Sequence, residues 1–164
     1  MSHTVNTKVV IVGKGIAGLV LSILLKRKGI DHVVLDRIEK KRKPALAETL
    51  PPSTLVLLET LELKELFERS SLKTFGYHSL WGTHQVTDNN FFFHNPYKYG
   101  LKIAKSILLS DLEKEAGTEV ISFQHLLDIN LGKNAVQVNL RQDNEELTVN
   151  GEILIDATGR NRAV

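Results

Sequence analysis

The sequence contains no cysteine, and it has only one methionine and one tryptophan. Without a thiol the chain forms no disulfide, no cysteine-based zinc or iron–sulfur site and no cysteine nucleophile. A redox-active cysteine pair is excluded for the same reason.

Neither sign of charge dominates, because 21 Lys and Arg stand against 19 Asp and Glu, which leaves a net charge of +2. This balance gives no reason to predict a nucleic-acid or membrane partner. No stretch approaches the roughly 18 apolar residues of a membrane span, and residues 1–8 lack the apolar core of a signal peptide. We therefore expect a soluble cytoplasmic protein. With 164 residues, 42% hydrophobic and 24% charged, the composition is that of a folded globular chain.

The first 36 residues predict a βαβ unit. Residues 8–12 form a short apolar run typical of a buried strand, and residues 15–28 place apolar side chains at helical spacing. A second apolar run at 32–36 predicts another strand, parallel to the first.

The rest of the chain alternates helical and strand-like patterns. A charged segment, 37–44, is expected to be a solvated loop. The helices are expected within 52–69 and 105–116, and the strands at 75–83, 90–94, 120–123, 126–131, 135–141, 146–149 and 152–156. Short turns between the runs of 126–149 indicate antiparallel hairpins.

A G-x-G-x-x-G motif, Gly13 to Gly18, lies between the first strand and its helix. Such a motif favours dinucleotide binding, since Gly13 allows a tight turn, Gly15 lets the backbone approach a pyrophosphate and Gly18 lets the helix pack closely. Asp36 ends the second strand, where its carboxylate accepts ribose hydroxyls and repels a 2′-phosphate. The motif alone leaves NAD and FAD open, as well as a glycine-rich turn of another α/β protein.

Four segments carry a resemblance to a known family. Residues 9–19 with 34–37, then 48–52, 79–82 and 156–160, occur in the order seen in the glutathione-reductase-type FAD fold. More narrowly, they resemble the p-hydroxybenzoate-hydroxylase-like monooxygenases and the tryptophan-halogenase-like proteins.

The resemblance implies a set of FAD-binding residues. It implies that the glycines hold the pyrophosphate, that Asp36 and Arg37 contact the adenosine, and that Thr158 and Gly159 make backbone contacts near the phosphates. Lys105 stands where relatives commonly carry an arginine that reaches the flavin side, and lysine lacks the bidentate fork. The full implied set is Gly13, Gly15, Ile16, Ala17, Gly18, Asp36, Arg37, Lys105, Asp156, Thr158 and Gly159.

The fold implied by the resemblance is α/β: a Rossmann-like FAD/NAD(P)-binding domain with a β-meander, interrupted by part of an antiparallel substrate-domain sheet. Residues 1–72 and 103–164 would form the FAD-binding domain, and 73–102 the insertion. Relatives continue well past the segment 156–160, whereas this sequence stops at Val164. We therefore interpret it as the N-terminal part of such an enzyme.

The function implied is that of an FAD-dependent oxidoreductase, monooxygenase- or halogenase-like. FAD would be the cofactor, NAD(P)H a transient electron donor, and a small aromatic or apolar molecule the substrate. A reductase of the geranylgeranyl-reductase type and a non-catalytic dinucleotide-binding fragment remain as alternatives.

Two further groups of residues are candidates for function. No two of the six histidines have the spacing of metal ligands, and they are interpreted mainly as surface or sheet residues. The alternative is that one of His78, His84 and His94 acts as a general acid or base towards a substrate. The aromatic residues of the middle segment either form a sheet core or stack on a planar substrate, and both interpretations stay open; they are Trp81, Phe91, Phe92, Phe93, Tyr97 and Tyr99. No catalytic residue is assigned.

Overall fold

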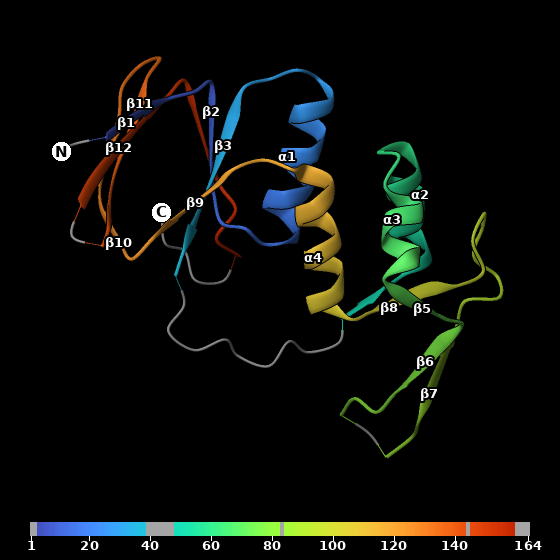
Figure 1. Ribbon diagram of the computed structural model, residues 1–164. Helices are drawn as coiled ribbons and strands as arrows, with labels where there is room; N and C mark the ends of the chain where they lie inside the picture. The colour runs from blue at the N-terminus through green and yellow to red at the C-terminus, as the bar shows by residue number, and fades with distance from the viewer. Residues whose placement is uncertain (1–2, 39–47, 83, 144, 160–164) are drawn as a thin grey trace. The chain divides into compact units, whose positions relative to one another are not determined.

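The computed structural model describes residues 3–38, 48–82, 84–143 and 145–159. It divides into two compact units, Met1–Arg42 with Leu112–Val164, and Lys43–Asp111. Both contain helices and strands (Figure 1), which confirms the mixed α/β class. In the described part of the chain no helix is long and apolar enough to span a membrane.

The first unit contains a four-stranded parallel sheet in the order β13-β2-β3-β9. Its strands are β2 (Val9–Val12), β3 (His32–Arg37), β9 (Val120–Phe123) and β13 (Ile153–Asp156). Between β2 and β3 the chain forms α1 (Ile16–Arg27), so the predicted βαβ unit is confirmed. The strand expected at 152–156 is confirmed as β13, which pairs with β2 although 144 positions of sequence separate Ile153 from its partner Val9.

A second four-stranded sheet, β1-β12-β11-β10, contains the predicted meander. The elements β10 (His125–Leu131), β11 (Val136–Gln142) and β12 (Glu145–Gly151) pair antiparallel, as expected from the turns between them. No pattern in the sequence predicted β1 (His3–Asn6), which pairs parallel to β12.

The two faces of the parallel sheet have different partners. Val10 and Val12 pack on the meander sheet, whereas Val9 and Ile11 pack on the α1 face, as expected from the two-residue period of a strand. Figure 1 shows the meander on one side of the parallel sheet and α1 on the other. Because both faces are covered, β2 is apolar throughout.

α4 (Lys105–Ala116) ends in the first unit, where it is tied to α1. The Lys26 ammonium donates to the carbonyls of Ala116 at 2.7 Å and Glu115 at 3.3 Å. Gly117 follows with φ +54, the left-handed conformation that commonly closes a helix. The last turn of α4 is therefore capped by a cation from a neighbouring helix.

The second unit combines two short helices with antiparallel strands. Its elements are α2 (Pro52–Thr60), α3 (Lys64–Arg69), the sheet β4-β8-β5 (Glu48–Leu50, Gly100–Ile103, Ser71–Thr74) and the hairpin β6-β7 (Gly76–Ser79, Thr87–Asn90). On α3, Glu68 accepts hydrogen bonds from Tyr99 and from Lys64. Burial, together with the Glu68 hydrogen bond, raises the pKa of Tyr99 to about 12.

The expectation of a strand at 90–94 is wrong. β7 ends at Asn90, and residues 91–94 form a turn closed by the His94 N–H on the Phe91 carbonyl. The aromatic residues 91–93 suggested the strand, but the residues that pair with β6 are the polar ones before them, Thr87–Asn90. Of these rings Phe91 is buried, with 5% exposed, whereas Trp81 and Phe93 are 91% and 90% exposed. The aromatic side chains of this segment therefore do not form a common core.

Candidate functional site

The glycine loop follows β2 at the carboxyl edge of the parallel sheet. The Gly13 N–H donates to the Leu35 carbonyl at 2.7 Å, and Gly13 adopts φ +112, which side chains rarely tolerate. A Cβ at this position would lie 2.5 Å from the Ala157 carbonyl oxygen. Gly13 is therefore required by the close approach of the loop to the end of β13.

The other two glycines have different surroundings. A Cβ on Gly18 would lie 2.0 Å from the Gly13 carbonyl oxygen, so Gly18 is required for α1 to pack against the loop. A Cβ on Gly15 would meet only the Ala157 carbonyl oxygen, at 4.0 Å. The fold itself therefore does not require glycine at position 15, and the space beside the Gly15 backbone is open.

The start of α1 is open to an anion. Gly15 is the N-cap with extended backbone, no side chain in the described part of the chain caps it, and the first turn carries no acid. The amides of the first turn, Ile16, Ala17 and Gly18, have no carbonyl within the helix to bond. Their partial positive charge favours a phosphate or pyrophosphate.

Asp36 is held beside the loop. Its Oδ1 accepts a hydrogen bond of 3.0 Å from the Lys14 N–H, so the carboxylate is oriented by the glycine loop itself. The next residue, Arg37, is exposed and ends β3 opposite Phe123 of β9. Asp36 is half-buried, and its carboxylate is suited to accept hydrogen bonds from the hydroxyl groups of a bound sugar.

The end of β13 forms a local turn next to Gly13. Asp156 Oδ1 accepts the Thr158 N–H at 2.9 Å and the Thr158 hydroxyl at 2.6 Å. These two bonds hold the pKa of Asp156 below its usual value. The Ala157 N–H bonds the Val12 carbonyl at 2.8 Å, and Gly159 follows with φ +66. The turn therefore presents its backbone to the loop, and the Asp156 carboxylate maintains the turn.

The structure brings ten of the eleven predicted residues to one edge of the first unit. Lys105 belongs to the second unit, where its Nζ pairs with Glu48 Oε1 at 2.8 Å. Arg160, part of the motif at 156–160, lies outside the described residues, as does most of the charged segment 37–44.

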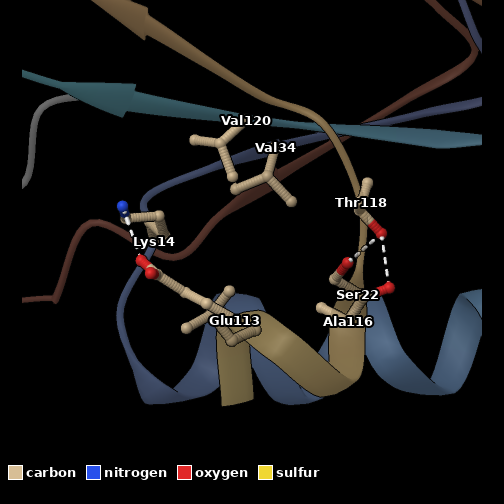
Figure 2. Close-up of a pocket in the computed structure, with 8 residues that line it drawn as sticks. Lys14, Ser22, Val34, Glu113, Ala116, Thr118 and Val120 are labelled. Carbon is tan, nitrogen blue, oxygen red and sulfur yellow. Dashed lines mark hydrogen bonds and ion pairs between the residues drawn. The ribbon is translucent and has the colours of Figure 1, made fainter. Parts of the chain in front are cut away.

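Two charged residues of this edge had no assigned role. The Lys14 ammonium forms an ion pair with Glu113 of α4 at 2.5 Å (Figure 2). Lys14 stands at the variable second position of the motif, and no local pattern could have linked it to a helix about a hundred residues later. The pair lines a pocket of about 210 Å³ between α1, α4 and the sheet.

The other end of this pocket has a hydroxyl cluster. Ser22, fully buried, lies 2.8 Å from His32 Nε2 and 3.0 Å from the Thr118 hydroxyl, while His32 Nδ1 lies 2.9 Å from the Ile30 carbonyl. Ser22 and Thr118 line the pocket in Figure 2. These contacts join α1 to the starts of β3 and β9.

The second unit has an apolar pocket of about 460 Å³ lined by Thr49, Pro51, Tyr77 and Phe91. The Tyr77 and Phe91 rings meet edge to face, with centroids 6.1 Å apart. Among the described residues no group of His, Asp and Glu side chains is arranged to hold a metal ion.

Comparisons with known proteins find similar sequences and folds. The family model for the FAD binding domain matches residues 6–164. YhjG of Bacillus subtilis (strain 168), described as an uncharacterized aromatic compound monooxygenase, is 30% identical over 158 residues, which cover 94% of this chain and 32% of the relative. The chain thus spans about a third of the length of this curated relative.

Two solved structures show the same fold. The p-nitrophenol 4-monooxygenase PnpA of Pseudomonas putida DLL-E4 has a TM-score of 0.80 at 16% identity, covering 97% of this chain and 42% of that one. The flavin-dependent halogenase CmlS has a TM-score of 0.72 at 27% identity, covering 94% of this chain and 29% of that one.

Proposed function

We propose that this chain, which belongs to the FAD binding domain family, holds the ADP half of FAD on its glycine loop. The observation that carries the proposal is the difference between the glycines. Gly13 and Gly18 are required by the fold, but the space beside Gly15 is open and faces the uncapped start of α1. A pyrophosphate fits such a position because it needs close approach to backbone amides.

The chain's own residues would divide the binding between them. The first-turn amides of α1 would bond the pyrophosphate oxygens, and the Asp36 carboxylate, oriented by the Lys14 N–H, would accept the ribose hydroxyls. The turn at 156–159 would support the loop from behind, through the contact between Ala157 and Gly13. Bound FAD supplies hydride and oxygen chemistry, while the protein supplies binding and orientation.

The wider function we propose is that of the FAD-binding part of a monooxygenase- or halogenase-like oxidoreductase. Its substrate would be a small aromatic or apolar molecule, in keeping with the names of YhjG and PnpA. The apolar pocket beside Tyr77 and Phe91 would contribute one wall of the substrate site. NAD(P)H would be the electron donor and the cytoplasm the compartment.

The test is a titration of the purified chain with FAD, followed by flavin fluorescence. Saturable quenching is expected for the native chain. Gly15→Ala should weaken binding at least about tenfold, because a methyl group then occupies the space that the pyrophosphate needs. Gly29→Asn is the matched control: Gly29 has φ +65, has nothing within 4 Å of its Cβ position and lies at the far end of α1.

Unchanged FAD affinity in Gly15→Ala would refute the site assignment. A chain that binds FAD should then be mixed with NADH or NADPH and oxygen uptake recorded. Oxygen consumption with release of peroxide supports the monooxygenase-like function, whereas flavin reduction without oxygen uptake favours a reductase.

A further inference from the structure

Lys14 contacts two acids by two different groups. Its backbone N–H donates to Asp36 Oδ1 at 3.0 Å, and its ammonium pairs with Glu113 Oε1 at 2.5 Å. Figure 2 shows the Lys14 side chain directed towards Glu113 on α4. The backbone of Lys14 is thus bonded to Asp36, while its side chain is directed to Glu113.

The position of this ammonium bears on which nucleotide the loop accepts. Because the Lys14 backbone lies beside the Asp36 carboxylate, its flexible four-carbon stem can also bring the ammonium to the ribose that Asp36 would bind. Lysine is a common phosphate ligand, so an ammonium at that place would attract a 2′-phosphate. The ion pair with Glu113 holds the ammonium on the α4 side instead.

We infer that Glu113 is a specificity-determining residue, which keeps Lys14 from binding a 2′-phosphate and so reserves the site for nucleotides with a free 2′-hydroxyl. The inference rests on the proposed function, since it places the adenosine ribose at Asp36. Under this inference Glu113 neutralises the charge of the Lys14 ammonium, and the Asp36 carboxylate is left to repel a 2′-phosphate.

The experiment compares two ligands that differ only in this phosphate, ADP-ribose and 2′-phospho-ADP-ribose. Each is titrated into the full chain by calorimetry, and each is also tested for displacement of FAD. The native chain should prefer ADP-ribose. In Glu113→Gln the preference should fall about tenfold, the size of one charge-assisted hydrogen bond gained by the phosphate, and the affinity for ADP-ribose should change by less than about threefold.

Two further variants separate the mechanism from a general change of charge. Glu115→Gln removes the same charge from the same helix, but its partner is Arg27 at 3.7 Å, so the preference should stay as in the native chain. Lys14→Met combined with Glu113→Gln should restore the native preference, because the released ammonium is gone. Melting temperatures of all variants should agree closely, since ion pairs that are partly exposed to solvent contribute little to stability.

The outcomes are distinct. If Glu113→Gln binds ADP-ribose and prefers it over 2′-phospho-ADP-ribose as strongly as the native chain does, the role of Glu113 is overturned. The proposed function is then unaffected. If Glu115→Gln lowers the preference as much as Glu113→Gln does, the role of Glu113 is overturned too, because the loss of any negative charge then has the same effect. A native chain that binds neither FAD nor ADP-ribose overturns the proposed function, and this inference with it.

Discussion

Replacing Gly18 by alanine adds one methyl group where the glycine loop and α1 are closest. The Cβ would lie 2.0 Å from the Gly13 carbonyl oxygen and 3.4 Å from the Ala157 Cβ. Gly13 is itself held by the Leu35 carbonyl at 2.7 Å. The start of α1 would therefore have to move by about 1.4 Å to bring these two atoms from 2.0 Å to an ordinary contact distance, in a region that is packed as densely as an organic crystal.

The magnitude follows from two opposing contributions. Forcing a methyl group into a packed site costs about 1 to 3 kcal/mol, and the upper value applies because the clash is with backbone. Alanine inside a helix gains about 1 kcal/mol over glycine. The expected net loss is about 2 kcal/mol in the free energy of unfolding. For a chain of this length that lowers the melting temperature by roughly 4 to 8 °C.

Thermal denaturation followed by circular dichroism measures this loss. Gly15→Ala is the matched variant, because its Cβ meets nothing closer than 4.0 Å and its φ of −81° suits alanine. We expect it to melt within about 2 °C of the native chain. If Gly18→Ala melts as high as the native chain, the close approach of α1 to the loop is not a feature of the folded protein and the reasoning fails.

Three other predictions concern contacts that lie within one or the other of the two units. Lys26→Met removes the cap on the last turn of α4 and should cost about 1 kcal/mol in urea denaturation, and an unchanged midpoint would contradict the cap. Ser22→Ala breaks its contact with His32 in a fully buried place and should cost about 1 to 2 kcal/mol by the same assay; a neutral effect would show the contact to be dispensable. Burial and the hydrogen bond to Glu68 raise the pKa of Tyr99 from 10.0 to about 12, so the folded state prefers the neutral phenol. The stabilisation is complete below pH 10 and is lost as the pH rises through about 12, so melting temperatures between these values should fall less steeply in Tyr99→Phe than in the native chain.

The sequence predicted the βαβ unit and the meander well because both depend on local signals. Buried strands such as β2 need apolar residues on both faces, and hairpins need short turns. The strand expected at 90–94 failed because aromatic residues were taken as its ladder, whereas Asn89 and Asn90 pair with β6. β1 was missed because a short polar strand has no pattern apart from its partner β12.

The arrangement of the proposed FAD-binding residues was predictable to the extent that the backbone determines it. The glycines, Asp36 and the turn at 156–159 meet because the carboxyl ends of parallel strands meet. The ion pair of Lys14 with Glu113 was not predictable, because it depends on how α4 lies beside the loop.

The pairing of β1 with β12 also has a consequence for the order in which the molecule assembles. His3 pairs with Leu147 and Asn6 with Asn150, so β1 has no partner until the residues of β12, 144 positions later, have been synthesised. The second unit, Lys43–Asp111, is continuous in sequence and needs no such wait. Because non-local pairings form late, the interrupting unit folds during synthesis while the flanking one is still incomplete. The face of β2 that carries Val10 and Val12 is meanwhile uncovered, because its partners in the meander have not yet been synthesised.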